Sequence, residues 1–355
     1  MGHGPIQEGA EVKNSDLQIA DKIIANQLKL ERFSAGEKKK VLAVLVDMRA
    51  ELVAKLRAGD VTDFARGRLK TLLKQCEAVI DHGYGQIQTT LDFEGLAKVE
   101  AEATIQPLAA VGFEATLPTT AAMKALINGS VIEGAPSNLW WKKQSEDLQF
   151  KFAAQVRQGV SQGETLMDIV RRVAGSKRLG TAGIMEVARR NAFSLVHTSV
   201  MQVAADARLA TFRANGDIVK GVRHLSVLDG HTSLVCVARS GAEWDLNGNP
   251  IKGKFPFQSP PLHFNCRSVL TPITLTYREL GVDRPELPVG TRASDEGQVR
   301  ADITMTEWLK SKPKAYVDDL LGKGRSDLFL SGKITLSQLV SGSGRELTLE
   351  ELKAL

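Results

Sequence analysis

One stretch, residues 222–272, limits the possible folds of this chain more than any other. It holds two of the three cysteines and three of the six histidines among the 355 residues. Short apolar runs alternate in it with Asp229-Gly230 and Asn247-Gly248, dipeptides that favour tight turns because Asn, Asp and Gly tolerate unusual backbone angles. We therefore expect a small β-rich module whose turns bring Cys236 towards His263 and Cys266.

Local composition predicts the elements of this module. Residues 222–228 and 268–273 are β-rich and predict strands. Residues 235–237 predict a further extended piece, and residues 244–251 predict a hairpin around Asn247-Gly248-Asn249. Pro260-Pro261 is expected to hold the approach to His263 extended.

The cysteines and histidines of the module suggest a metal site. His263-x-x-Cys266 is a ligand pair at the close spacing that zinc uses, and Cys236 is a plausible third ligand. Thiolate and imidazole suit Zn²⁺, and a structural site takes four ligands. We expect His231, at the tip of a turn, as the fourth, with Asp229 or water as alternatives. Without metal, the cysteines would be small buried hydrophobes or, less expected in a reducing cytoplasm, a disulfide.

Two blocks in this stretch carry a resemblance. D-x-x-T-S-x-x-C begins at Asp229, and P-P-x-H-x-N-C-R-S begins at Pro260. Their order resembles the phage Mu F-like family of minor head proteins, also called phage head morphogenesis proteins. Similar segments outside the blocks extend the resemblance over roughly residues 185 to 355. Arg is usual in that family where His197 and His231 stand here, so no role of those arginines carries over.

The resemblance implies a minor head protein of a tailed phage or prophage, which supports procapsid assembly near the portal vertex. The partners it implies are the portal protein, the major capsid or scaffold protein and packaged DNA. The implied location is the virion, and the host cytoplasm during assembly. The alternative is a metal-dependent nucleic-acid hydrolase built on the Cys/His cluster. We expect no enzyme, because the phosphate-loop, G-x-S-x-G and H-E-x-x-H motifs are all missing from the sequence.

Charge is distributed unevenly along the chain. Residues 151–225 hold twelve Lys or Arg against five Asp or Glu, a net charge of +7, while the whole chain carries +5. Such a stretch can contact DNA through its phosphates without sequence specificity, and the residues expected to do so are Arg171, Arg172, Arg189 and Arg190. The alternative is a solvated face of long helices.

Helical periodicity and stop signals predict the rest of the chain. One helix is expected over 16–31, and another from a capping box at Ser34–Glu37 to Arg57, before Gly59. Further helices are expected over 63–81, stopped by Gly83, over 86–107, and over 184–214. No stretch approaches the ~20 apolar residues of a membrane span. An odd cysteine count also argues against a disulfide framework.

These elements predict an α+β fold, with a helical N-terminal region, a small β-rich module and an extended or helical C-terminal tail. The expected division is a mobile N-terminus over 1–15, a helical region over 16–116 and a connecting helical, basic region over 117–183. The head-morphogenesis module follows over 184–274, and a docking tail over 275–355.

Overall fold

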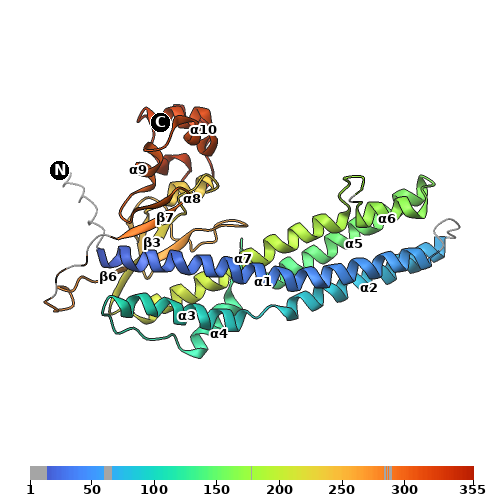
Figure 1. The fold of residues 1–355 in the computed structure, drawn as a ribbon, viewed down its shortest axis with the longest axis horizontal. Helices are drawn as coiled ribbons and strands as arrows, with labels where there is room; N and C mark the ends of the chain where they lie inside the picture. Colours follow the sequence, from blue (N-terminus) through green and yellow to red (C-terminus); the bar gives the residue numbers. More distant parts are fainter. Residues whose placement is uncertain (1–13, 60–65, 177, 284, 286, 288–289) are drawn as a thin grey trace. The chain divides into compact units, whose positions relative to one another are not determined.

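The computed structural model describes residues 14–59, 66–176, 178–283, 285, 287 and 290–355 (Figure 1). It confirms an α+β fold in which long helices come first and small antiparallel sheets follow. The predicted mobile N-terminus lies, up to residue 13, outside the described residues. In the part of the chain that the structure describes, no helix combines the length and the apolar character needed to cross a membrane.

Two compact units interleave along the chain, so they cut across the predicted boundaries. We call them the sheet unit, which takes in α1 up to Lys29, Glu94–Asn128 and Met201–Leu355, and the helical unit, which takes in Leu30–Phe93 and Gly129–Val200. The elements up to residue 214 are α1 (Asn14–Ala58), α2 (Arg66–Thr90), α3 (Phe93–Ala110), α4 (Thr120–Gly129), β1 (Val131–Ile132), β2 (Ala135–Pro136), α5 (Ser137–Ser161), α6 (Leu166–Ala174) and α7 (Ile184–Ala214).

Helix α1 is continuous, so the predicted new helix at Ser34 is wrong. Ser34 and Glu37 are both buried in the middle of the helix instead of capping its start. The reason is a stripe of buried side chains that recurs every three or four residues without a break, namely Leu30, Ser34, Glu37, Val41, Leu45, Met48, Leu52 and Leu56. The predicted end before Gly59 is confirmed.

Gly83 does not stop the helix that contains it, since α2 continues to Thr90. A Cβ at Gly83 would lie 2.3 Å from Met48 Cε, so glycine here allows α1 and α2 to approach closely. The predicted start of this helix at residue 63 lies outside the described residues. The following helix, expected over 86–107, is Phe93–Ala110. The bounds predicted for α7 are confirmed.

The sheet unit is built on a four-stranded antiparallel sheet of order β5-β4-β3-β6. Its strands are β3 (Val219–Leu225), β4 (Glu243–Asp245), β5 (Pro250–Lys252) and β6 (Val269–Thr274). Val222 pairs with Trp244 on one side and Pro272 on the other. Val222 and Trp244 have no exposed surface. The hairpin predicted at residues 247–249 therefore joins β4 to β5. Asp16 of α1 accepts hydrogen bonds of 2.9 and 2.7 Å from Thr274, which fixes the start of α1 on β6.

Residues 235–237 are helical and not extended, which corrects the prediction for this segment. They lie in α8 (Leu234–Arg239), whose N-cap is Ser233. The hydroxyl of Ser233 accepts from the backbone N–H of Cys236, and this satisfies a donor that would otherwise have no partner at the helix start. The Pro260–Pro261 peptide bond is cis.

The C-terminal segment belongs to the core of the sheet unit. It contains the hairpin β7 (Thr291–Ser294) and β8 (Gly297–Arg300), helices α9 (Met305–Lys310), α10 (Lys314–Leu321), α11 (Lys323–Leu330) and α12 (Leu349–Lys353), and a 3₁₀ helix over Leu336–Leu339 (Figure 1). Trp308, Leu309 and Leu339 are buried in the same cluster as Val222 and Trp244. The segment predicted as a docking tail thus packs on its own module.

Candidate metal centre

Two local structures place the sulfur and nitrogen atoms of the candidate site. Capping by Ser233 starts α8, and its first turn carries the buried Cys236 inward. Just before β6, a backbone hydrogen bond of 3.1 Å from Cys266 to His263 closes a turn. Asn265 adopts a positive φ of 61° within this turn, a conformation that Asn tolerates better than most residues. His263 and Cys266 therefore come from one turn and Cys236 from the helix facing it.

The three side chains meet at distances that suit zinc. Cys236 Sγ lies 3.6 Å from Cys266 Sγ and 3.4 Å from His263 Nε2, and one ligand atom from each residue lies within 4.8 Å of the others. Tetrahedral zinc with bonds of about 2.3 Å to sulfur and about 2.0 Å to nitrogen would separate the two sulfurs by about 3.8 Å and each sulfur from the nitrogen by about 3.5 Å. Both cysteines are free thiols. The predicted grouping of Cys236, His263 and Cys266 is confirmed as a geometry able to hold a metal.

The tautomer of His263 is fixed by its neighbour. Its Nδ1 lies 2.9 Å from the carbonyl oxygen of Phe264, which can only accept, so Nδ1 carries the proton. Nε2 then presents its lone pair to the two sulfur atoms, as a metal-binding histidine does. The Ser233 hydroxyl lies 2.8 Å from the same Nε2 and can donate to it. This arrangement orients the imidazole before any metal binds.

The two thiols hold their protons unequally. The hydrogen bond from Cys236 lowers the pKa of Cys266 well below that of a free thiol. The same hydrogen bond, together with burial, raises the pKa of Cys236. One thiolate therefore forms easily and the second only with difficulty, because two negative charges would stand 3.6 Å apart. A bound divalent cation would remove that repulsion and allow both thiolates to form.

His224 is a residue near the thiols that sequence reasoning did not single out. It lies on β3 without exposed surface, and neither ring nitrogen has a hydrogen-bond partner among the described residues. Burial lowers its pKa to about 4, while its electrostatic interaction with Cys266 acts in the opposite direction. A histidine at an inward position of a central strand was the only sequence signal. The imidazole is therefore neutral at pH 7.

His231, the predicted fourth ligand, does not lie in this group. Its side chain is exposed, and its one hydrogen bond among the described residues is from its backbone N–H to Asp229 Oδ1, at 2.9 Å. Asp229 closes the turn in this way, and the turn leaves the His231 imidazole in solvent. The two buried cysteines and the half-buried His263 thus leave the fourth position to another group.

A second contact joins the two sequence blocks. Arg267 donates to both oxygens of Asp229, at 2.6 and 2.9 Å, and Thr232 also donates to Asp229 Oδ1 at 3.2 Å. Burial would raise the pKa of Asp229, but the hydrogen bonds from Arg267 and the backbone of His231 outweigh it and lower the pKa. The block from Asp229 to Cys236 and the block from Pro260 to Ser268 are therefore joined by an ion pair as well as by the Cys/His group.

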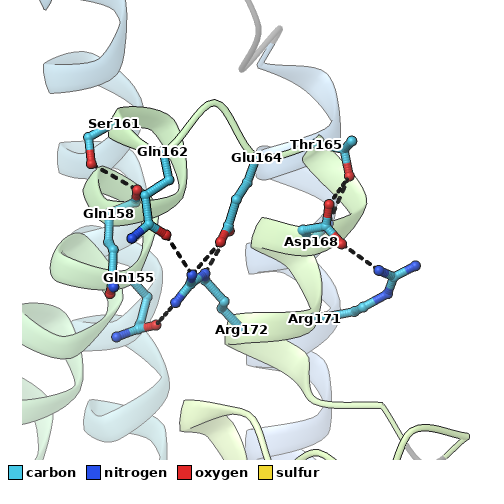
Figure 2. A network of polar contacts seen from close by, with 9 residues as sticks. All are labelled: Gln155, Gln158, Ser161, Gln162, Glu164, Thr165, Asp168, Arg171 and Arg172. Carbon is cyan, nitrogen blue, oxygen red and sulfur yellow. Dashed lines mark hydrogen bonds and ion pairs between the residues drawn. The ribbon is translucent and has the colours of Figure 1, made fainter.

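Three of the four arginines expected to bind DNA are engaged locally. Figure 2 shows Arg172 held by Glu164, Gln155 and Gln162, an arrangement that ties the last turn of α6 to α5 and to the loop between them. Arg171 is paired with Asp168. Arg189 forms an ion pair with Glu186 on its own helix. Each pair lowers the charge available to a phosphate.

Arg190 differs from these three. It is exposed and makes no hydrogen bond or ion pair with another residue in the described part of the chain. Among the four it is the one most available to a polyanion. DNA binding by this group stays a prediction.

Comparison with models of protein families, with curated proteins and with solved structures gave no match to this chain.

Proposed function

We propose that this chain is a minor head protein of a tailed phage or prophage, acting in head assembly near the portal vertex. One observation carries the proposal. The two sequence blocks that resemble the Mu F-like family lie 23 residues apart in the chain, and their polar residues meet in one small region through Asp229–Arg267 and Cys236–His263–Cys266. The resemblance thus corresponds to a built structural unit, which favours a shared architecture over a chance match of residues.

The Cys/His group is proposed to hold a structural zinc ion. Cys236, His263 and Cys266 would bind it, and the fourth position would be taken by water or a neighbouring side chain. The two cysteines are buried, and the group joins α8 to the turn that precedes β6. A metal here would tie these segments together and add its binding free energy to folding.

A metal-dependent nucleic-acid hydrolase is the second candidate, because the group offers only three protein ligands. Three protein ligands with an open fourth position is the arrangement of catalytic zinc, in which the fourth ligand is an activated water. The buried position of both thiols favours the structural role, since a substrate phosphate has to reach the metal. Neither of the two cavities of about 260 Å³ in the sheet unit is lined by the three candidate ligands.

The partners proposed are those of a head protein, namely portal protein, major capsid or scaffold protein, and phage DNA bound without sequence specificity. The test is to tag the chain in the phage or prophage that encodes it and to purify heads after induction. Mass spectrometry should find the chain in heads at a few copies per portal, and pull-down should recover the portal protein. Asp229→Asn with Arg267→Leu should reduce incorporation, whereas Arg300→Gln on the exposed face of β8 should not.

The two candidates are separated by a nuclease assay on the purified protein with added Zn²⁺, Mn²⁺ or Mg²⁺. A head protein should leave single- and double-stranded DNA and RNA intact. Metal-dependent cleavage that disappears in Cys266→Ser would replace the proposal with the hydrolase. Heads that lack the chain altogether would contradict it independently.

A further inference from the structure

Arg292 of β7 is a buried cation whose charge is not balanced locally. Its side chain is 4% exposed, its Nε is buried without an acceptor, and the described residues offer it neither a hydrogen bond nor an ion pair. Two other buried arginines of the same unit have carboxylate partners, Arg208 in Glu100 and Arg223 in Glu243, and the buried Arg239 donates to the carbonyl oxygen of Pro256. A buried unpaired charge is costly, so a guanidinium in this position calls for an anion.

Arg292 also lines two cavities. Each has a volume of about 260 Å³, and both are lined by Leu225 and Arg292. The first lies over the face of the sheet that carries Arg223 and Thr271, beneath the start of α1 and the segment 301–306. Arg292 thus borders space large enough for a small molecule or a side chain although it has almost no exposed surface.

The charges around the first cavity favour an anion. Arg223, Lys252 and Arg292 line it, against the single carboxylate of Asp302. Arg223 is already paired with Glu243, and Asp302 is paired with Arg300. Two positive charges, those of Arg292 and Lys252, are therefore left without an opposing charge in the lining.

We propose that this cavity binds a carboxylate through Arg292. The planar guanidinium matches a carboxylate with two parallel hydrogen bonds. Much of the remaining lining is apolar, including Leu17, Ala20 and Leu225, which suits a carboxylate on a short aliphatic stem. A phosphate would turn its remaining oxygens towards these apolar groups, at a cost in desolvation. The carboxylate comes either from a small free acid or from a Glu side chain of a protein partner. This inference goes beyond the proposed function and does not depend on it.

The experiment compares the wild-type protein with two variants by isothermal titration and thermal unfolding. Glutarate should bind the wild-type protein and raise its Tm, whereas its neutral analogue glutaramide should not, and inorganic phosphate should bind at least about tenfold more weakly. Arg292→Met should weaken glutarate binding at least about tenfold. Without ligand it should be as stable as wild type or more so, because the substitution removes an unpaired buried charge. Arg278→Gln, which replaces an exposed arginine of the same unit that lines neither cavity, should bind glutarate as wild type does.

A second ligand, a blocked tripeptide with Glu at its centre, distinguishes a small free acid from a Glu side chain of a protein partner as the source of the carboxylate. Tighter binding of the peptide than of glutarate assigns the site to a protein partner, and the reverse order assigns it to a small acid. Unchanged glutarate binding in Arg292→Met overturns the proposal. So does a Tm in that variant that falls by more than about 5 °C, since Arg292 would then have a partner within the protein.

Discussion

Arg267 and Asp229, 38 residues apart, form a two-pronged ion pair with distances of 2.6 and 2.9 Å. The pair closes the module beside the Cys/His group and connects the turn after β3 to the segment before β6. Asp229 is largely shielded, with 13% of its side chain exposed, whereas Arg267 keeps 32%. The stability it contributes is therefore reduced by solvent screening on the arginine side.

Asp229→Asn is expected to lower the free energy of unfolding by about 1 kcal/mol at pH 7, after that screening. The folded pKa of Asp229 is lowered, so its contribution is complete above the unfolded value of about 3.9 and is lost as pH falls through the folded value. Urea unfolding from pH 7 to pH 2.5 should show the two proteins converging below about pH 4. A difference that stays constant down to pH 2.5 would show that the carboxylate charge is not the cause.

Zinc binding is tested by elemental analysis of protein purified without chelator or nickel resin. Wild type should carry about one equivalent, and Cys266→Ser should carry almost none and unfold several degrees lower. Cys76→Ser is the matched control, because it also replaces a buried thiol by a hydroxyl but lies outside the group. It should keep its zinc whatever its Tm. His231→Ala should also keep zinc, since that side chain is exposed.

A chelator should lower the Tm of wild type towards that of Cys266→Ser and leave the Tm of Cys266→Ser unchanged. Wild-type protein with less than about a tenth of an equivalent of zinc, and with Cys236 and Cys266 reactive in the folded state, would leave the three residues as core packing alone.

The buried pair of Arg208 and Glu100 is expected to be strongly coupled. Both side chains are 2% exposed, Arg208 Nε donates to Glu100 at 3.0 Å, and Asn26 donates to the other carboxylate oxygen at 2.7 Å. Arg208→Met leaves a buried carboxylate with only that neutral donor and should cost about 3–5 kcal/mol. The double variant with Glu100→Leu should recover much of this loss. Additive losses in a double-mutant cycle by urea unfolding would exclude the coupling.

Gly183 should not tolerate a side chain. A Cβ there would lie 2.2 Å from the backbone nitrogen of Gly175 and 2.5 Å from the carbonyl oxygen of Val173, and backbone atoms cannot move aside as a side chain can. Gly183→Ala is expected to cost about 3 kcal/mol. Gly85→Ala is the control, because its Cβ would meet nothing within 4 Å and alanine favours the helix by up to about 1 kcal/mol. Equal thermal stabilities of the two variants would contradict the close approach.

DNA binding is expected to depend on Arg190 more than on its neighbours, since Arg171, Arg172 and Arg189 are paired with carboxylates. Arg190→Glu should weaken binding of any duplex sequence, and the affinity of wild type should fall steeply with salt. Arg172→Gln should instead lower thermal stability, because it loosens the connection between α5 and α6. Fluorescence anisotropy at 50 and 200 mM salt measures the affinity, with Arg57→Glu as a control outside the basic stretch. A DNA affinity that stays unchanged at 200 mM salt, or that is the same in Arg190→Glu as in wild type, would exclude this interface.

Local sequence signals determined a large part of this fold. The bounds of α7, the end of α1 before Gly59 and the hairpin at Asn247-Gly248-Asn249 all follow from signals within a few residues. The same holds for the membership of Cys236, His263 and Cys266 in one group, because a close-spaced ligand pair and a turn-rich stretch limit where the third residue can lie. Such features depend on backbone preference and spacing, which the sequence states directly.

Tertiary structure decided those features of the fold that depend on burial against residues far away in the chain. Ser34 and Glu37 would suit a helix start, yet they lie within α1 because their positions continue a buried stripe. Cys236 lies on a helix although its neighbours are β-branched. Ser233 caps this helix, and residues 236–239 of the helix are buried.

The same holds for charged and polar side chains. A sequence counts arginines but does not show that Glu164 neutralises Arg172, nor that Arg292 is buried without a partner among the described residues. The sequence also led to the prediction that His231 is a metal ligand, whereas the turn closed by Asp229 leaves that imidazole exposed. Pairing and burial are long-range properties, because their free energy depends on which groups the folded chain brings within a few ångströms of each other and removes from water.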